Sequence, residues 1–313
     1  MQLRTAVSGM GRIGWMFHAP HVVEHPGFTL VGVCDPMQER CKESEDFFHV
    51  PAYTAYSEML RVQKPDLVII ASPSMVHAEQ AIVAMEQGVD VFLDKPMAIS
   101  YDEVTRIVQT QRRTGRKLMM YQPMRVTDET AQLKQILDSG IIGEVHLIKL
   151  TVGAFVFRND WQAFTKYGGG ALNNVCSHYI DLLIYLTGAM MQTPRCFCKT
   201  ILSLGDAEDF VKILMEATNH ITVDLEVNMA AAIAMPKWHV YGDKGAATLV
   251  DDDPAHAYFH VRYYDPKTMP FIETNDTLAA KDRLYIHNGP TEWNTVDYPV
   301  NAEKDKNYFD YSR

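Results

Sequence analysis

The feature that most constrains the fold is a glycine pattern that directly follows a short apolar run near the start of the chain. The run from Leu3 to Val7 leads into Gly9, Gly11 and Gly14, spaced as G-x-G-x-x-G. In a strand–turn–helix unit that binds a dinucleotide, the first glycine permits the tight turn and the second lets backbone N–H groups approach the pyrophosphate. The third lets the helix pack close to the strand, with its N-terminus facing the phosphates. Ordinary loops also carry glycines at this spacing, so the prediction needs support from the downstream sequence.

A second predicted strand supports the dinucleotide interpretation. Residues 29–34 are mostly apolar and end in Asp35, about twenty residues on, where an acid accepts hydrogen bonds from the adenosine ribose. The alternative role for Asp35 is that of a turn residue before Pro36. We expect NAD rather than NADP, because the Asp35 carboxylate would repel a 2′-phosphate and neither Pro36 nor Met37 supplies a cation. Arg40 is an exception if its side chain folds back.

Length, composition and charge narrow the class of protein. The chain has 313 residues, more than one hydrophobic core usually organises, so two domains are expected. Apolar residues make up 47% and charged residues 22%, which is typical of a globular protein. The net charge of -10 argues against a nucleic-acid partner, which requires clustered cations. No long apolar segment or cleavable leader is recognised, so neither a membrane nor secretion is indicated.

The cysteines indicate a reduced environment and no metal. Their number is odd and their spacing does not match a zinc site. The five cysteines are Cys34, Cys41, Cys176, Cys196 and Cys198. Cys196 and Cys198 lie two residues apart in a predicted strand, so their thiols would point to the same face. We therefore expect free thiols and a cytoplasmic location.

The first part of the chain alternates predicted helices and strands, as a parallel sheet requires. The apolar run Leu67–Ala71 suits a central strand that is buried on both faces. Ser72 and Pro73 follow at its carboxyl end, the side where ligands bind in open α/β sheets. The next strand, Val89–Leu93, ends in the sequence Asp-Lys-Pro. A cofactor domain is predicted over residues 1–123.

The second part, residues 124–313, has a different pattern of predicted helices and strands. A helix over 129–139 and a long strand over 144–157 precede three consecutive glycines, which open a predicted helix over 171–186. Several β-rich runs joined by short turns follow, which favours a mostly antiparallel sheet. We expect these residues to form a second domain.

Three motifs together carry a resemblance to a known family. The glycine loop, the sequence Asp94-Lys95-Pro96, and the run Gly168-Gly169-Gly170-Ala171-Leu172 through His178 and Asp181 occur in this order. The chain resembles the glucose-fructose oxidoreductase and inositol dehydrogenase family, Gfo/Idh/MocA, over essentially its whole length. The resemblance implies an α/β fold that begins with an N-terminal Rossmann domain with a doubly wound parallel sheet. An α+β domain follows, here residues 124–313, which binds substrate and whose large, mostly antiparallel open sheet commonly forms the subunit interface. Members usually oxidise or reduce a sugar or cyclitol carbon with a nicotinamide cofactor.

The resemblance also implies roles for the loops that follow the central strands. The family's Glu-Lys-Pro motif matches Asp94-Lys95-Pro96, which places Lys95 in the cleft against a substrate hydroxyl, where an ammonium stabilises a developing alkoxide. A surface lysine at a strand end is the alternative. The segment from Ser72 and Pro73 to His77 resembles the family's cofactor-contacting Thr-Pro-Asn-x-x-His, although His77 could equally be a capping or packing residue.

The helix after the triple glycine departs from the family pattern. Many members carry an aspartate and, four residues later, a histidine on the same helix face. This chain has His178, but Asn174 at the position of the aspartate and Cys176 at the position of a glycine. The resemblance implies that His178 exchanges the hydroxyl proton, while Asn174 orients the substrate without assisting proton transfer. Asp181, on nearly the same face, could substitute for the missing carboxylate.

Less specific candidates complete the site. Residues near the nicotinamide or the sugar include Gln122, Arg125, Arg158, Asp160, Trp161 and Tyr167, each of which could instead make an ordinary loop contact. Trp161 is the one for which a core anchor is the preferred interpretation. The predicted cofactor contacts are Gly9, Gly11, Arg12, Ile13, Gly14, Asp35, Ser72, Pro73, His77, Asp94, Lys95 and Gln122. The predicted substrate contacts are Lys95, Arg125, Trp161, Asn174 and His178.

The sequence as a whole predicts a homo-oligomeric oxidoreductase that transfers a hydride between NAD(P) and a sugar, cyclitol or related polyol. A rival interpretation is a dinucleotide-binding or sensing protein that has lost turnover. Asn174 and Cys176 support that rival, and so does the ending at Arg313 without an expected terminal helix.

Overall fold

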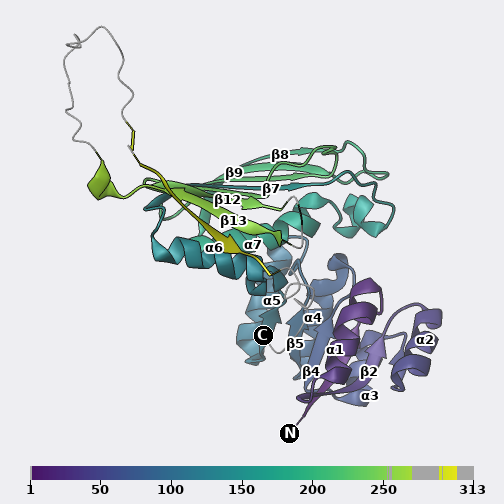
Figure 1. The fold of residues 1–313 in the computed structure, drawn as a ribbon. Helices are drawn as coiled ribbons and strands as arrows, with labels where there is room; N and C mark the ends of the chain where they lie inside the picture. The colour runs from purple at the N-terminus through teal and green to yellow at the C-terminus, as the bar shows by residue number, and fades with distance from the viewer. Residues whose placement is uncertain (1, 252, 254–255, 270–288, 291, 302–313) are drawn as a thin grey trace, which may run out of the picture.

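The computed structural model describes residues 2–251, 253, 256–269, 289–290 and 292–301. Within these residues the chain forms two sheets with different architectures (Figure 1). The first sheet is six-stranded and entirely parallel, and the second is eight-stranded and mostly antiparallel. Both predictions about the sheets are thus confirmed.

The first sheet has the strand order β3-β2-β1-β4-β5-β6, in which the chain reverses direction across the sheet between β1 and β4. Its strands are β1 (Leu3–Ser8), β2 (Phe28–Cys34), β3 (Ala52–Tyr53), β4 (Leu67–Ile70), β5 (Asp90–Leu93) and β6 (Leu118–Met120). Its helices are η1 (Gly14–His18), α1 (Ala19–Glu24), α2 (Gln38–Phe48), α3 (Tyr56–Gln63), η2 (Ser74–Val76), α4 (His77–Glu86) and α5 (Tyr101–Thr114).

The central strands of this sheet are covered on both faces, as their apolar sequences predict. Val68 and Ile70 pack in one apolar cluster with residues of α3, α4 and α5, whereas Ile69 packs in another with residues of α1. Alternate residues of a strand point to opposite faces, so a strand between two helix layers needs apolar side chains at every position. Because β1, β4 and β5 are parallel neighbours, their carboxyl ends lie at the same edge of the sheet, and this edge carries the predicted cofactor loops.

The second sheet has the order β14-β13-β12-β11-β7-β10-β9-β8, with one parallel pair, β7 and β10. Its strands are β7 (Val145–Gly153), β8 (Met191–Lys199), β9 (Phe210–Ala217), β10 (Thr222–Asn228), β11 (Trp238–Gly242), β12 (Gly245–Val250), β13 (Tyr258–Tyr263) and β14 (Asn294–Pro299). The helices of this part are η3 (Pro123–Val126), α6 (Asp128–Ser139), η4 (Trp161–Ala163), η5 (Thr165–Tyr167), η6 (Leu172–Cys176), α7 (Ser177–Thr187) and η8 (Pro266–Thr268).

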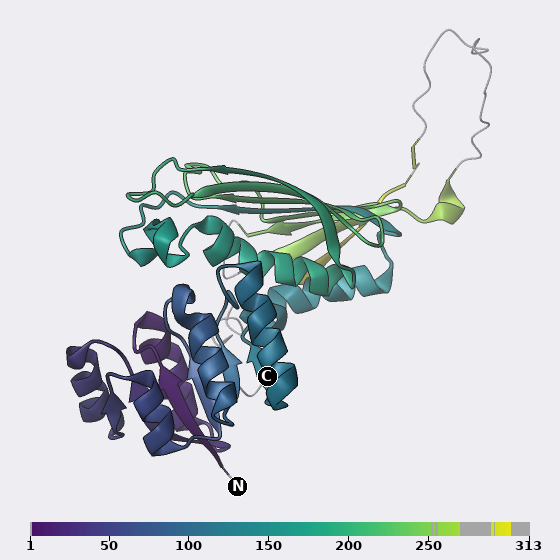
Figure 2. The same cartoon turned by 180° about the vertical axis from the view of Figure 1, so that it is seen from behind.

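Helices α6 and α7 cover one face of the second sheet, and the described residues place no helix on the other face (Figure 2). Leu225 of β10 and Ile213 of β9 belong to the apolar core on the helix side, together with Leu182 and Leu183 of α7. On the opposite face Lys212 lies 2.6 Å from Asp224 and 3.0 Å from Glu226. One side of this sheet is thus a core, and the other is a mixed polar surface.

Two elements differ from the sequence prediction. The long strand expected over 144–157 ends at Gly153, and Phe155 then makes an isolated bridge with Ala230. The helix expected over 171–186 begins as a π-helix, η6, before it continues as α7. The π-helix contains Asn174, which gives this irregularity a direct bearing on the site.

Candidate active site

The glycine loop has the geometry that a dinucleotide requires. Gly9 has a φ of +90°, and a Cβ there would overlap the backbone at Ser72. A Cβ on Gly14 would overlap the carbonyl oxygen of Gly9, so the following helix packs directly against the loop. By contrast, the nearest atom to a Cβ on Gly11 would be Arg40 Nη1 at 3.9 Å. The space in front of Gly11 is open, as the approach of a pyrophosphate demands.

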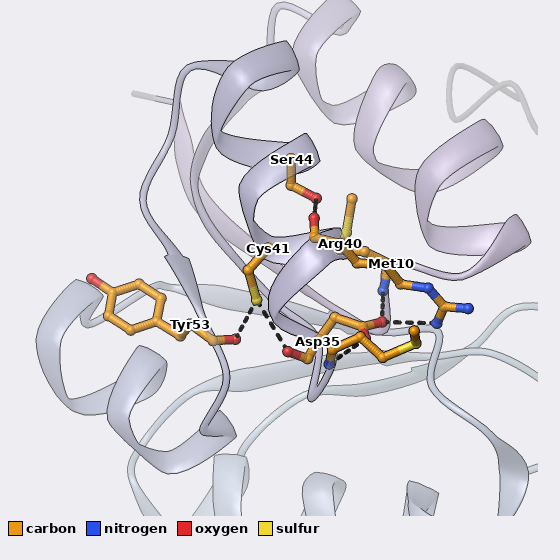
Figure 3. A network of polar contacts seen from close by, with 7 residues as sticks. Met10, Asp35, Arg40, Cys41, Ser44 and Tyr53 are labelled. Atoms are coloured by element: carbon orange, nitrogen blue, oxygen red, sulfur yellow. Dashed lines mark hydrogen bonds and ion pairs between the residues drawn. The ribbon is translucent and has the colours of Figure 1, made fainter.

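Asp35 at the end of β2 is buried within a network of polar contacts (Figure 3). Its Oδ2 accepts a hydrogen bond from Met10 N at 2.9 Å, and its Oδ1 accepts one from Met37 N at 3.0 Å. Arg40 Nη1 lies 3.3 Å from Oδ2, and the Arg40 side chain is 43% exposed whereas that of Asp35 is 3% exposed. Arg40 therefore does fold back onto Asp35. The carboxylate is shielded, and a guanidinium is the exposed charge at this end of the loop.

Lys95 reaches from the end of β5 to the π-helix of the second part of the chain. Its Nζ donates to the Asn174 backbone oxygen at 2.6 Å and to Asn174 Oδ1 at 2.9 Å. Burial lowers the pKa of Lys95 to about 8, because the ammonium loses hydration; Asp94 opposes this shift, and the charges of Arg158 and Arg12 add to it. The Lys95 ammonium thus extends from the first part of the chain to Asn174, and its contact with a substrate hydroxyl stays a prediction.

His178 lies one turn beyond Asn174 and stays neutral. Burial, followed by the positive charge of Lys95, lowers the pKa of His178 to about 3, with Asp94 opposing the shift. Its Nδ1 is buried and has no hydrogen-bond partner among the described residues. An imidazole with this pKa does not take up a proton near neutral pH, although it can still donate or accept a hydrogen bond.

The predicted substitute for the missing carboxylate is engaged elsewhere. Asp181 Oδ2 accepts a hydrogen bond from Arg125 Nε at 2.7 Å, and its Oδ1 accepts a second one from Arg125 Nη2. The Arg125 guanidinium also lies 5.5 Å from the centre of the Tyr185 ring. This bidentate pair joins η3 to α7, and it gives both residues a structural partner.

His77 connects the loop after β4 with the loop after β5. The ring is buried, with Nδ1 2.7 Å from the Pro96 oxygen and Nε2 2.8 Å from the Ser72 oxygen. The Ser72 hydroxyl is bonded to Gln80 Oε1 at 2.8 Å. This geometry gives His77 a packing role, and its predicted contact with the cofactor stays a prediction.

A small cavity of about 50 Å³ lies beside Asn174 in the second part of the chain. Its lining residues are Val156, Arg158, Gln162, Gly170, Ala171, Asn174, Val175, Ser203, Glu208, Asp209 and Met229. Arg158 is held by Asp160 through two contacts of 3.0 Å each. Trp161 lies half-buried in η4 and is not part of the apolar core, so the expectation of a core anchor is wrong.

Two residues of the site, Gln162 and Glu208, were missed by the sequence analysis. Gln162 Nε2 donates to Asn174 Oδ1 at 3.2 Å. Glu208 Oε1 accepts a hydrogen bond from Leu172 N at 2.9 Å, and its carboxylate would overlap a Cβ on Gly170. The triple glycine is the signal that could have revealed them, because such a run marks a place where other groups approach the backbone closely.

Gln122 Oε1 is buried without a hydrogen-bond partner among the described residues. No cluster of three or more His, Cys, Asp or Glu side chains in the described part of the chain could hold a metal ion. None of the helices described has the length and apolar character needed to cross a membrane.

Comparisons with known proteins identify the family. Residues 3–122 match the model of an oxidoreductase family with an NAD-binding Rossmann fold, and residues 130–248 match the GFO/IDH/MocA C-terminal domain. The chain belongs to the Gfo/Idh/MocA family of oxidoreductases, so the resemblance inferred from the sequence is confirmed.

Two curated relatives and one solved structure illustrate the similarity. D-glucoside 3-dehydrogenase of Escherichia coli is 27% identical over 59% of this chain and 54% of its own length. The scyllo-inositol 2-dehydrogenase (NAD(+)) of Bacillus subtilis is 30% identical over 60% of this chain and 55% of its own. The chain thus spans about half the length of these two relatives. An NAD-binding protein from Listeria innocua shares the fold, with a TM-score of 0.80, 24% identity, and coverage of 96% of this chain and 83% of that protein.

Proposed function

We propose that this protein transfers a hydride between a nicotinamide cofactor and a carbinol or carbonyl carbon of a sugar, cyclitol or related polyol. The observation that carries the proposal is the meeting of Lys95 and Asn174 beside His178, at the edge of the first sheet where its ligands bind. The relatives named as glucoside and inositol dehydrogenases support a polyol substrate. We also propose a boundary between a cofactor domain and a substrate domain at residues 123 and 124, and the limits of the two family models, 3–122 and 130–248, support it.

The residues fit a dinucleotide, and each part of it has a proposed contact. The pyrophosphate would lie against Gly11, Arg12 and Ile13, where the space is open. Asp35 and Arg40 would meet the adenosine ribose. The remaining cofactor contacts would come from Ser72, Pro73 and Gln122. When bound, the nicotinamide accepts or donates the hydride at its C4. NAD is the preferred form. The difference in affinity between NAD and NADP is reduced, because the Arg40 guanidinium offsets the charge of Asp35 that repels a 2′-phosphate.

Lys95 rather than His178 handles the proton of the reacting hydroxyl. An alcohol that loses a hydride must also lose its hydroxyl proton, and the most effective acceptor has a pKa near the working pH. Lys95, with a pKa of about 8, meets this condition, whereas His178, with a pKa of about 3, does not. The neutral His178 donates or accepts a hydrogen bond at the same oxygen. Asn174 holds the Lys95 amine in place without the carboxylate charge that would raise its pKa.

The test is turnover on a panel of sugars and cyclitols with NAD or NADP, followed through the absorbance of the reduced nicotinamide. An enzyme of the proposed kind reduces the cofactor with at least one polyol, and the Lys95→Met variant loses this activity while it still binds NADH. The rival, a sensing protein, would bind NADH with enhanced fluorescence and turn over no member of the panel. The names of the relatives favour the enzyme.

We further propose a cytoplasmic homo-oligomer, for which the open face of the second sheet is the candidate interface.

A further inference from the structure

The strand β8 carries two thiols that the proposed reaction does not use. Cys196 and Cys198 point to the same face of the sheet, as the sequence spacing predicted. They lie opposite Ile213 and Val211 of β9, so this face is the helix side. Both are nevertheless exposed, because β8 is the last strand at that edge of the described sheet. Their Sγ atoms lie 3.5 Å apart and share a hydrogen bond.

The position of β8 makes a shorter sulfur–sulfur distance attainable. The strand pairs with β9 on one side only, and its register shifts between Gln192 and Arg195. Alternate residues of a strand are separated by about 6.4–6.8 Å, which is the upper end of the Cα separation that a disulfide spans. A bond of about 2.05 Å therefore requires a local buckle of an edge strand and no rearrangement of the core. A disulfide formed under such strain is easily reduced again.

We propose that Cys196 and Cys198 form a reversible intramolecular disulfide, and that this pair is a redox modification site for small disulfide oxidants such as oxidised glutathione. The Cys196 thiolate attacks one sulfur of the oxidant, and the glutathione thiolate that leaves takes up a proton. Cys198 then loses its proton and attacks the Cys196 sulfur of the mixed disulfide, which releases a second glutathione. The dithiol is thereby oxidised by two electrons, and one glutathione disulfide is reduced to two thiols.

The order of the two cysteines follows from their environment. Burial, the hydrogen bond and charge of Cys196, and the charge of Glu208 raise the pKa of Cys198 to about 11. Either sulfur can donate in the contact between them, and the raised pKa of Cys198 favours its protonated form. The proposal therefore assigns Cys196 as the attacking sulfur and Cys198 as the resolving one.

The remaining cysteines are poor competitors. Cys176 lies in η6 near this pair but is fully buried, and burial with the nearby charges of Cys196, Cys198 and Glu208 raises its pKa to about 12. Cys34 and Cys41 are buried in the first part of the chain. Oxidation is therefore expected at β8 alone, since an oxidant must reach the sulfur that it modifies.

The experiment treats the native protein with oxidised glutathione, labels the remaining thiols under denaturing conditions, and maps the labels by mass spectrometry. The reduced protein should take five labels, one for each cysteine. The oxidised protein should lose two of these, at Cys196 and Cys198, and regain them after incubation with excess reduced glutathione. In the Cys198→Ser variant the reaction should stop at a mixed disulfide between Cys196 and glutathione. The control variant, Cys41→Ser, should still form the disulfide between Cys196 and Cys198.

Three outcomes would overturn the proposal. They are full labelling after oxidation, a disulfide that includes Cys176, and a disulfide-linked dimer through Cys196 or Cys198. Circular dichroism of each serine variant establishes that its fold is intact. Polyol turnover plays no part in the readout, so the result is independent of the proposed function.

Discussion

The ammonium of Lys95 donates to the side-chain oxygen of Asn174 over 2.9 Å, although the two residues are 79 positions apart in the chain. The contact joins the end of β5 to the π-helix η6, and so it links the first part of the chain to the second. Since the partner is an amide and not a carboxylate, the lysine is held in position without being held in its charged form.

Replacing Lys95 with methionine should lower the turnover of a true substrate by about 10²-fold or more, the usual contribution of a positioned acid or base. The affinity for NADH should remain unchanged, because the ammonium contacts the second part of the chain and not the glycine loop. Steady-state kinetics and NADH fluorescence titration measure the two effects. Lys42→Met, at an exposed position of α2, is the matched control. Full activity of the Lys95 variant would remove the assigned role.

The rate of polyol oxidation should rise with pH through a limb near pH 8, because the neutral amine of Lys95 accepts the proton. In Asn174→Asp, the new carboxylate favours the ammonium and raises the pKa of Lys95, so this limb should move to higher pH. In the neighbouring Asn173→Asp the limb should stay close to its original place, since Asn173 bonds to the Gly168 oxygen and not to Lys95. If the limb does not move in Asn174→Asp, it does not report the titration of Lys95.

Replacing His178 with alanine should reduce the turnover by roughly tenfold, the effect of losing one hydrogen bond. The shape of the pH profile should not change, because a histidine with a pKa of about 3 does not titrate within the usual assay range. Comparison of the full profiles of wild type and variant tests this. Loss of a limb between pH 5 and 8 in the variant would instead return the role of proton acceptor to His178.

Replacing Arg40 with glutamine should strengthen the preference for NAD over NADP. Without the guanidinium, the charge of Asp35 is no longer offset, and a 2′-phosphate is repelled more strongly. We expect the ratio of the two dissociation constants to change about fivefold, as for an exposed charge contact of about 1 kcal/mol. Calorimetry of both cofactors gives the ratio, and Arg61→Gln on α3 is the control. Tighter binding of NADPH than NADH by the wild type would contradict the stated preference.

The open face of the second sheet should form the contact between subunits. Phe197 is 60% exposed and Leu214 is 42% exposed on that face, beside the ion pairs of Lys212. Two copies related by a two-fold axis would bury both apolar side chains. Light scattering should report an oligomer that Leu214→Glu weakens, whereas Val62→Glu on α3 leaves it intact. A monomeric wild type at micromolar concentration would refute this assembly.

The sequence predicted those parts of the site that depend on backbone requirements. The glycine loop and the strand ends follow from steric rules and from apolar runs, and they placed Gly9, Gly14 and Lys95 correctly in the fold. The π-helix could not be predicted, because an α-helix and a π-helix share almost the same apolar pattern over a single turn. Side-chain pairings that join distant segments, such as Arg125 with Asp181, leave no periodic signal in a single sequence.

The contact between Arg40 and Asp35 likewise could not be predicted from the sequence. The place of Arg40 five positions after Asp35 was visible, but the rotamer that brings its guanidinium to the carboxylate was not. Gln162 and Glu208 likewise entered the site only through the close packing around the triple glycine.

The His77 ring, held between the Ser72 and Pro96 carbonyl oxygens, acts as a cross-brace between neighbouring strand ends. A displacement of the loop after β4 is therefore transmitted to the loop that presents Lys95. For protein engineering, these two loops and His77 should be transferred together. A graft of either loop alone into another scaffold would lack the His77 contacts that fix the position of one loop relative to the other.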